Sequence, residues 1–292
     1  MAAESYANPD ALVSTEWLAA HLAAPDVRVV DGSFKLPGIT PTARDDYLRR
    51  HIPGAVFFDV DEIADDASPL PHMLPRPEKF AARMRKMGLG DGNRIIVYDT
   101  AGLVSAARVW WMFRVFGHRD VAILDGGLPK WLAEGRPVDD LTPLPRERHF
   151  TSRFDATLVR SKEQIAENLG TRREQIVDAR AANRFEGSVD EPRPGLRRGH
   201  IPGSLNIPLD RLTDPQTKTV RPAEDLRRLF EEAGVDLGRP VAATCGSGVT
   251  ACGLAFGLYL LGRSNAAVYD GSWSEWGLPG DTPVETGPAK AR

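Results

Sequence analysis

A cysteine at the head of a glycine-rich loop is the side chain of this sequence best suited to covalent chemistry. Cys245 directly follows the apolar run 240–244, and the loop Cys-Gly-Ser-Gly-Val-Thr leads into a helical pattern. Such a loop points backbone N–H groups and the positive end of the helix dipole inward, which lowers the pKa of a thiol there. Gly246 and Gly248 allow the necessary tight bend. We therefore expect Cys245 to be a thiolate nucleophile that a substrate can reach, the alternative being a small buried residue at a strand end.

The loop sequence narrows the kinds of cysteine chemistry. A phosphatase loop of the form Cys-x5-Arg would place an arginine where this chain has Ala251. A Cys/His hydrolase would need a base and an oxyanion hole, and residue spacing does not exclude it. A persulfide needs space and several hydrogen-bond donors around its outer sulfur, which a short glycine-rich loop offers. The loop therefore favours sulfur chemistry at Cys245.

Composition excludes several classes of function. The chain has 292 residues, 42% hydrophobic and 26% charged, with a net charge of −3, which argues against a broad nucleic-acid-binding face. Its apolar stretches end before the roughly 20 residues that a membrane span needs, and no signal-peptide pattern opens the chain. The two cysteines exclude a disulfide scaffold and suit a reducing compartment, and the six histidines do not cluster. We expect a cytoplasmic monomer without a metal, a cofactor, a nucleic-acid partner or a membrane partner.

An internal repeat organises the chain. Three blocks recur in the same order, the last at a constant offset of 145 residues: 29–34 with 176–181, 49–60 with 198–209, and 94–131 with 239–276. This order indicates duplication of one domain.

The repeat predicts one working site and one silent copy. We expect a non-catalytic domain at 1–140, a proline- and charge-rich linker at 141–158, and a catalytic domain at 159–292. Asp99 or Thr100 stands opposite Cys245 in the first copy, and neither side chain can do thiolate chemistry.

Each half alternates short apolar runs with helical patterns. Strands are expected at 27–31, 94–99, 121–126, 240–244 and 266–271, and helices at 77–88, 103–117, 222–234 and 248–262, with a capping box at 161–164. This alternation predicts an α/β fold in which each domain is a parallel sheet with helices on both faces. Function is then expected where the carboxyl ends of strands meet the amino ends of helices.

Several motifs together resemble the two-domain rhodanese/sulfurtransferase family. They are the loop at 245–252, the paired His-Ile-Pro-Gly blocks at 51–54 and 200–203, and the segments 72–75, 109–118 and 269–273. Within the family, the loop resembles that of 3-mercaptopyruvate sulfurtransferases, because Gly246 and Ser247 are neutral where thiosulfate-preferring members carry basic residues. The resemblance implies two tandem rhodanese-like domains with one site in the cleft between them.

The resemblance also implies a role for individual residues. Cys245 would become the persulfide, and Ser247 would relay a proton with His72 and Asp61. Arg184 and Arg193 would hold the substrate carboxylate, which a guanidinium fork can bind bidentately. The remaining loop residues are expected to line the substrate site: Gly246, Gly248, Val249 and Thr250.

The implied reaction moves sulfur from 3-mercaptopyruvate through Cys245 and releases pyruvate. The acceptor would be a thiol, such as thioredoxin or a low-molecular-weight thiol, or cyanide in an assay. Two alternatives stay open: a thiosulfate:cyanide sulfurtransferase, and a persulfide carrier or sensor with little turnover.

Other conspicuous residues are expected to serve the fold. The predicted roles are core or interdomain packing for Trp110, Trp111, Phe113 and Cys252, turn structure for His51 and His200, and packing at the end of the domain for Asp270 and Trp273. The loop 99–108 has Ala107 before Arg108 where relatives often have proline, and it could line the cleft.

Overall fold

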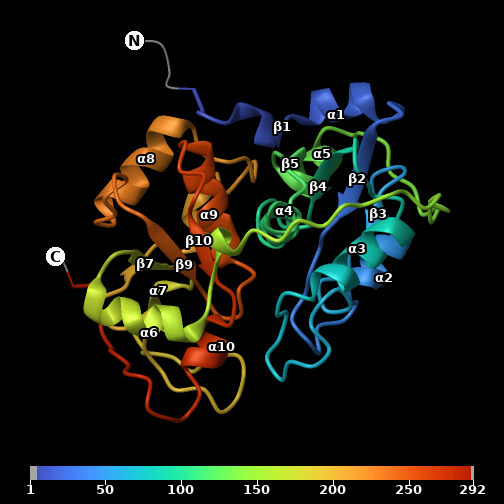
Figure 1. The fold of residues 1–292 in the computed structure, drawn as a ribbon. Coiled ribbons are helices and arrows are strands. Elements are labelled where there is room, and N and C mark those ends of the chain that lie inside the picture. Colours follow the sequence, from blue (N-terminus) through green and yellow to red (C-terminus); the bar gives the residue numbers. More distant parts are fainter. Residues whose placement is uncertain (1–4, 291–292) are drawn as a thin grey trace.

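The computed structural model of the protein describes residues 5–290 and shows two α/β lobes side by side (Figure 1). The outermost ends of the two predicted domains, residues 1–4 and 291–292, lie outside the described part. Each lobe contains one five-stranded sheet in which every strand pairs in parallel. The predicted α/β class is confirmed.

The first lobe has the strand order β1-β5-β4-β2-β3. Its strands are β1 (Leu12–Val13), β2 (Val27–Asp31), β3 (Val56–Phe57), β4 (Arg94–Tyr98) and β5 (Val121–Leu124). Its helices are η1 (Pro9–Ala11), α1 (Thr15–His21), α2 (Ala43–Arg49), α3 (Pro77–Lys86), α4 (Ala106–Val115) and α5 (Gly127–Ala133).

The second lobe repeats this order as β6-β10-β9-β7-β8. Its strands are β6 (Val159–Arg160), β7 (Gln175–Asp178), β8 (Leu205–Asn206), β9 (Val241–Thr244) and β10 (Ala267–Tyr269). Its helices are η2 (Ala156–Leu158), α6 (Lys162–Thr171), α7 (Ala182–Phe185), η3 (Leu209–Leu212), α8 (Ala223–Glu232), α9 (Ala251–Leu260) and α10 (Ser272–Trp276). The identical order in both sheets is what duplication of one domain predicts.

Local sequence signals explain where several helices begin. Ser161 and Gln164 form the expected capping box at the start of α6, and Pro77 opens α3. Two helices begin three residues later than predicted, α4 at Ala106 and α9 at Ala251. In both cases the missing turn belongs to the loop that follows a central strand, whose geometry the apolar pattern of the helix does not reveal.

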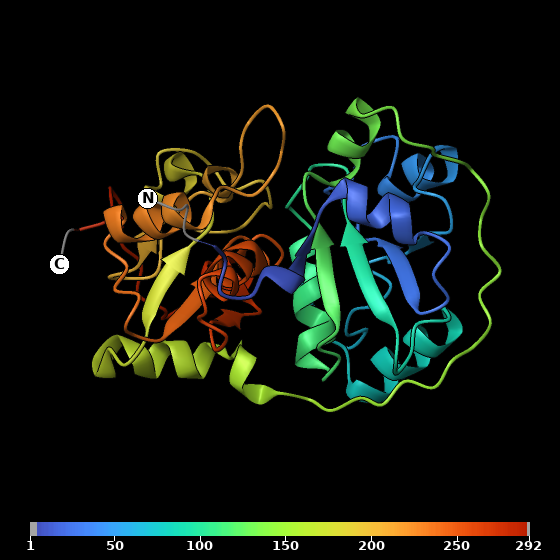
Figure 2. The same cartoon turned by 90° about the horizontal axis from the view of Figure 1, so that it is seen from above.

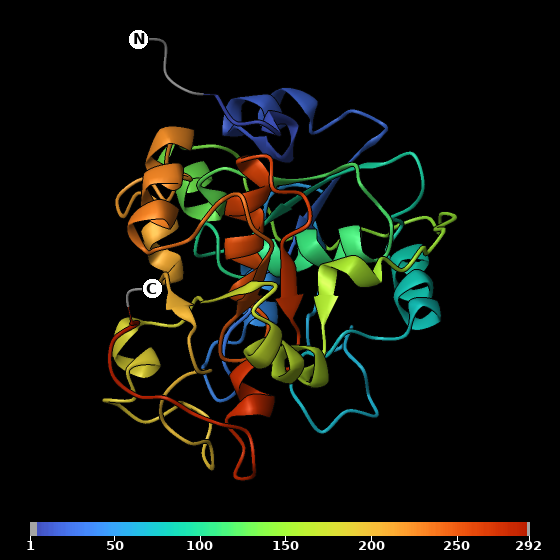
Figure 3. The same ribbon diagram turned by 60° about the vertical axis from the view of Figure 1, so that its left-hand side comes forward.

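The inner faces of both sheets share one apolar core that crosses between the lobes. Helices α4 and α9 pack against each other at this interface. On its other side, α9 lies beside α8, as the red and orange helices of Figure 3 show. Trp110 of α4 stacks edge-on against Phe256 of α9 at 4.9 Å, which confirms the predicted interdomain role of this tryptophan. The outer faces carry separate cores beneath α1 and α5 in the first lobe and α6 and α10 in the second.

The segment predicted as a linker lies along the first lobe. It runs around the outer edge of that lobe before entering the second (Figure 2). Phe150 is 2% exposed within the core, and the N–H of Asp91 bonds the carbonyl of His149 at 2.8 Å. The segment is therefore a packed strap, because one aromatic residue anchors a stretch whose composition is otherwise typical of linkers.

Two findings on the described residues bear on the functional classes. No helix within residues 5–290 is long and apolar enough to cross a membrane. In the same range, no group of three or more His, Cys, Asp or Glu side chains is placed to hold a metal ion.

Candidate active site

Cys245 stands at the carboxyl end of β9, at the start of the loop that leads into α9. Its N–H donates to the hydroxyl of Ser272 at 3.1 Å, and its carbonyl accepts from the N–H of Trp273 at 3.0 Å. The carbonyl of Gly246 accepts from the N–H of Ser274 at 2.8 Å and from its hydroxyl at 2.7 Å. Helix α10 therefore holds the first turn of the loop in place.

The first lobe contains a loop at the matching position, and its first residue is Asp99. The residues that precede Asp99 and Cys245 make equivalent hydrogen bonds. The carbonyl of Tyr98 accepts from the N–H of Gly32, and the carbonyl of Thr244 accepts from the N–H of Ala179. The carbonyls of the residues themselves are matched too, because Asp99 accepts from Leu128 and Cys245 accepts from Trp273, and these two donors are 145 residues apart. Asp99 and Cys245 are 146 residues apart, so the predicted constant offset of 145 does not hold at this strand end, and the loop of the first lobe is one residue longer. Asp99, and not Thr100, is therefore the counterpart of Cys245.

The carboxylate of Asp99 shows where the backbone N–H groups of such a loop point. Five of them donate to its two oxygens at 2.6–2.8 Å, from Ala101, Gly102, Val104, Ser105 and Ala106. The last three occupy the repeat positions of Val249, Thr250 and Ala251. A loop of this kind thus presents a ring of donors to an anion carried by its first residue.

The corresponding donors of the second lobe have no acceptor of this kind. Within residues 5–290, the N–H groups of the loop between Cys245 and α9 donate to no protein atom. The predicted loop residues Gly246, Gly248, Val249 and Thr250 all belong to this stretch, and Gly248 adopts φ +78°, which favours glycine.

His72, from the first lobe, faces this loop together with Asp61. The Nδ1 atom of His72 lies 2.6 Å from Oδ1 of Asp61, and the imidazole is nearly buried while the carboxylate is half exposed. On its other side, Nε2 of His72 lies 3.0 Å from Nη2 of Arg193. Because a guanidinium only donates, Nε2 accepts from Arg193, which leaves Nδ1 as the donor nitrogen; Nδ1 is close to Asp61 but makes no hydrogen bond to any described residue.

The predicted relay is only partly assembled. Asp61 and His72 meet as expected, but the hydroxyl of Ser247 makes no hydrogen bond to any described residue. Nε2 of His72 is next to Arg193 instead. The role of Ser247 stays a prediction.

The two predicted substrate arginines both lie near the Cys245 loop. Arg184 places Nη2 2.9 Å from the position that a Cβ on Gly246 would take, so only glycine fits there without movement. Burial lowers the pKa of Arg193, and the nearby Cys245 and Asp61 oppose this shift. Both cations are thus close to the cysteine, as a site for an anionic substrate requires.

A glutamate that the sequence analysis did not single out organises these cations. Glu191 accepts from Nη2 of Arg184 at 2.5 Å and from Nη1 of Arg180 at 2.8 Å. Arg180 is itself buried against Asp178 at 2.7 Å. The position of Glu191 between Arg184 and Arg193 in the sequence could have indicated this role, because two neighbouring arginines repel each other unless a carboxylate lies between them.

An ion pair that the sequence analysis also did not predict crosses the interface between the lobes, next to the Cys245 loop. Arg108 of α4 donates to Oδ1 of Asp270 at 2.6 Å, and neither side chain is more than 4% exposed. The prediction that Asp270 serves packing at the end of its domain is therefore incomplete. The position of Arg108 inside the apolar run 103–117 was the signal, because a buried charge requires a partner.

Cys245 is less accessible than a reachable thiol was expected to be. Only 1% of the residue is exposed. Arg184 lies against Gly246, and Arg193 lies against His72, so both arginines are next to the loop of this buried cysteine.

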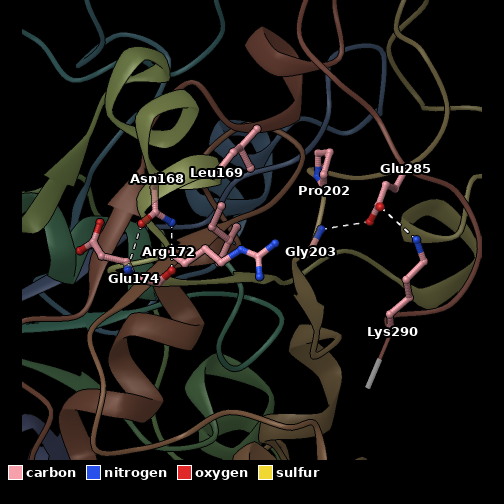
Figure 4. A pocket seen from close by; sticks show the side chains of 9 residues that line it. Asn168, Leu169, Arg172, Glu174, Pro202, Gly203, Glu285 and Lys290 are labelled. Atoms are coloured by element: carbon pink, nitrogen blue, oxygen red, sulfur yellow. Dashed lines mark hydrogen bonds and ion pairs between the residues drawn. The ribbon is translucent and has the colours of Figure 1, made fainter. Parts of the chain in front are cut away.

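A separate surface pocket of about 290 Å³ lies at the opposite edge of the second sheet (Figure 4). Glu174 precedes β7 there, whereas Cys245 follows β9. The polar groups of the pocket bond one another: Asn168 pairs with the backbone of Glu174, and Glu285 accepts from Lys290 at 3.0 Å. None of the predicted site residues lines this pocket.

Comparison with known proteins agrees with both the fold and the motifs. The profile of the rhodanese-like domain family matches residues 14–134 and 161–278. The 3-mercaptopyruvate sulfurtransferase of Homo sapiens is 46% identical over 272 residues, covering 91% of each chain. The thiosulfate sulfurtransferase of Cricetulus griseus is 45% identical, covering 95% of this chain and 96% of that protein.

A solved structure extends the likeness to three dimensions. The crystal structure of SseA from Escherichia coli, described as a 3-mercaptopyruvate sulfotransferase with the rhodanese fold, aligns with a TM-score of 0.83 and 40% identity. The alignment covers 91% of this chain and 99% of SseA. With both lobes matched and these identities spanning nearly the whole chain, the protein belongs to the family built from rhodanese-like domains.

Proposed function

We propose that this protein is a sulfurtransferase that takes the sulfur of 3-mercaptopyruvate onto Cys245 and passes it to a thiol acceptor. The family, the relatives named for this activity and the neutral residues Gly246 and Ser247 support this substrate. A single arginine-held carboxylate suits mercaptopyruvate, whose reacting sulfur carries no oxyanion of its own.

The observation that carries the proposal is the anion-holding loop of the first lobe. The oxygens of Asp99 lie two bonds beyond Cβ, and five N–H groups converge on them. The outer sulfur of a persulfide on Cys245 also lies two bonds beyond Cβ. The loop of the second lobe can therefore stabilise a persulfide anion with the same main-chain donors.

The transfer step balances without an oxidant or reductant. The Cys245 thiolate attacks the substrate sulfur, the S–S bond forms, and the carbon–sulfur bond breaks with its electron pair passing to the enolate of pyruvate. The substrate thiol loses its proton, and the enolate carbon gains one. The products are pyruvate and the Cys245 persulfide anion, and the acceptor thiolate then attacks the outer sulfur to regenerate Cys245.

Side chains around the loop would bind and orient the substrate. Arg184 and Arg193 would rotate from their present partners to hold the carboxylate and the carbonyl oxygen. Release of Arg193 frees Nε2 of His72. That nitrogen would take the thiol proton and return it to the enolate carbon, with Asp61 stabilising the imidazolium and Ser247 extending its reach.

Thioredoxin or a low-molecular-weight thiol would serve as acceptor, and cyanide would replace it in an assay. A reducing cytoplasm suits this cycle because it supplies such thiols and keeps Cys245 reduced. We propose that the chain acts as a monomer, since the two lobes of one chain supply every residue of the site.

Pyruvate release from 3-mercaptopyruvate tests the proposal. The wild-type protein should turn over and, without an acceptor, gain the mass of one sulfur atom. Cys245→Ser should lose both signals because the alcohol is a poor nucleophile at neutral pH. Cys252→Ala is the matched control for the other cysteine and should still gain the sulfur; turnover by Cys245→Ser would refute the assignment.

Thiosulfate is the second candidate donor, favoured by the relative from Cricetulus griseus named for it. Comparing kcat/KM for the two donors separates them. Arg184→Ala and Arg193→Ala should raise KM for mercaptopyruvate more than for thiosulfate, which has no carboxylate. Equal effects on both donors would contradict carboxylate binding. Stoichiometric loading without repeated pyruvate release would instead indicate a persulfide carrier.

A further inference from the structure

The buried ion pair between Arg108 and Asp270 joins the two lobes beside the candidate site. Arg108 belongs to α4 of the first lobe, and Asp270 follows β10 of the second. Burial disfavours the charged guanidinium, but Asp270 and Cys252 together offset this and raise the pKa of Arg108. The guanidinium therefore stays charged, and it depends on its ion pair with Asp270 for its place in the interior.

One arm of the pair holds the turn that carries His72. Arg108 donates through Nη2 to the carbonyl of His72, and the N–H of Leu74 donates to Oδ2 of Asp270 at 2.7 Å. His72 itself has φ +62°, a conformation that costs free energy for a residue with a side chain. Such a turn persists when its surroundings fix it, and the ion pair bonds it at the carbonyl of the strained residue and at the N–H two residues later.

The other arm holds the Cys245 loop. Nη1 of Arg108 donates to the carbonyl of Gly248 at 3.2 Å. In a trans peptide the following N–H points the opposite way, so this bond fixes the N–H of Val249 on the side away from Arg108. The first-lobe counterpart of that N–H, on Val104, donates to Asp99 at 2.7 Å. Arg108 thus determines the direction of one donor of the predicted sulfur cradle.

The repeat supplies a natural comparison that lacks the cation. Asp125 is the counterpart of Asp270 and accepts from the N–H of Val220 across the interface at 2.8 Å, as Asp270 accepts from Leu74. The position matching Arg108 is Gly253, where a Cβ would come within 2.2 Å of Leu209. The crossing hydrogen bond is therefore kept on both sides of the interface, whereas the arginine is present only beside the cysteine.

We propose that Arg108 and Asp270 are positioning residues for sulfur transfer, which hold the His72 turn of one lobe in register with the Cys245 loop of the other. The proposal builds on the proposed function but concerns a different step, the assembly of the site before substrate binds. Neither residue touches the substrate.

The decisive variant is Arg108→Met combined with Asp270→Asn. It removes both charges together, so that no unpaired charge stays buried, and the amide oxygen still accepts from Leu74. With folding verified by circular dichroism, kcat should fall about 10- to 100-fold while KM changes less than about 3-fold, as expected for misplaced reacting groups. Alkylation of Cys245 should also require a higher pH, because a loop donor is no longer fixed.

Arg108→Lys tests the fork of the guanidinium in a variant that keeps the ion pair. A lysine can pair with Asp270 but cannot hold the carbonyls of His72 and Gly248 in one plane. We expect kcat between those of the wild type and the double variant. Asp125→Asn is the matched control at the same interface and should keep kcat within about 2-fold, since its hydrogen bond from Val220 can persist.

Wild-type kcat and an unchanged alkylation profile in the folded Arg108 variants would overturn the proposal. An equal loss of kcat in Asp125→Asn would do so as well, because it would indicate general loosening of the interface. Alkylation of Cys245 needs no substrate. Its pH profile therefore tests the positioning role even if wild-type protein does not act on 3-mercaptopyruvate, an outcome that would refute only the proposed function.

Discussion

In the loop that follows β4, the carboxylate of Asp99 accepts hydrogen bonds from five backbone N–H groups, whereas the loop that follows β9 begins with Cys245. Both loops occupy the same place in the repeat, and each faces the opposite lobe. The first has its anion built in and fixed. The second carries a thiol whose anion, or persulfide, can form and be consumed. At the same place in the repeat, one copy thus has a carboxylate held by its own loop, and the other has a free thiol, as the proposed function requires.

The residues that cover the two loops are also exchanged between the lobes. His72 of the first lobe lies in a turn with φ +62°, and Lys218 of the second lobe has the same φ in the matching turn. Lys218 lies against the first-lobe loop, since a Cβ on Gly102 would come within 2.8 Å of its Cβ. Both lobes therefore have the same backbone conformation in this turn, but only the turn near Cys245 carries an imidazole.

The largest effect on stability should come from removing the carboxylate of Asp99, which the loop after β4 surrounds. Asp99→Ala leaves five N–H groups without their acceptor, three of them in fully buried hydrogen bonds, and we expect the free energy of unfolding to fall by about 4 kcal/mol in urea titrations. Asp99→Asn keeps one carbonyl oxygen and should lose about half as much. Cys245→Ala, at the matching position, should cost only about 1 kcal/mol because no N–H bonds to its sulfur. Similar losses at both positions would contradict the contrast between the loops.

The next largest effect, on kcat, should distinguish His72 from its counterpart Lys218. His72→Asn should lower kcat about 100-fold, the usual scale for loss of an acid–base group. Lys218→Asn should change kcat less than about 2-fold. Asparagine tolerates positive φ, so neither variant should unfold, and thermal melts check this. A comparable loss of kcat in Lys218→Asn would show that the turn matters and the imidazole does not.

A smaller effect concerns pH and the two crossing aspartates. Burial raises the pKa of Asp125 to about 6, with the N–H of Val220 opposing the shift. The folded protein therefore binds this proton more tightly than the unfolded chain, and the resulting stability is full below about pH 4 and is lost as pH rises through 6. Asp125→Asn does not titrate, so above pH 6 it should be about 2 kcal/mol more stable than the wild type.

The control for this prediction is the counterpart that has a cation. Asp270→Asn leaves Arg108 buried without its ion-pair partner, so it should lower stability at neutral pH instead of raising it. Denaturation of both variants at pH 4 and pH 7 distinguishes the two cases. A gain at neutral pH in both variants would mean that the arginine contributes nothing at this interface.

Only some features of these two loops and their surroundings could be predicted from the sequence. Strand and helix patterns and the repeat suffice for the parallel α/β fold, and the glycine-rich loop suffices to single out Cys245, because these signals are local. The start of α4 was misplaced because Leu103 and Val104 are apolar yet belong to the Asp99 loop. His72 and Arg193 could be proposed only by resemblance, since their contact joins residues far apart in the chain.

Arg108 shows the same limit for a charged residue. Its place in an apolar helical run indicates a buried ion pair, but nothing local identifies Asp270, in the other lobe, as the partner. The contact between Arg193 and His72 was likewise not predictable, because the two residues belong to different lobes. Interactions that depend on how two domains dock require the tertiary structure.

The smallest effect tests a single sulfur atom beside the loop. Cys252 is fully buried, burial raises its pKa, and its Sγ donates weakly to the carbonyl of Gly248 at 3.2 Å. The first lobe has Ala107 at this position, so Cys252→Ala makes the two loops alike there. We expect a loss of about 1 kcal/mol in stability and less than about a 3-fold change in kcat, because Arg108 still holds the same carbonyl. A loss of kcat as large as that expected for the Arg108 variants would instead assign the control of this carbonyl to the second cysteine.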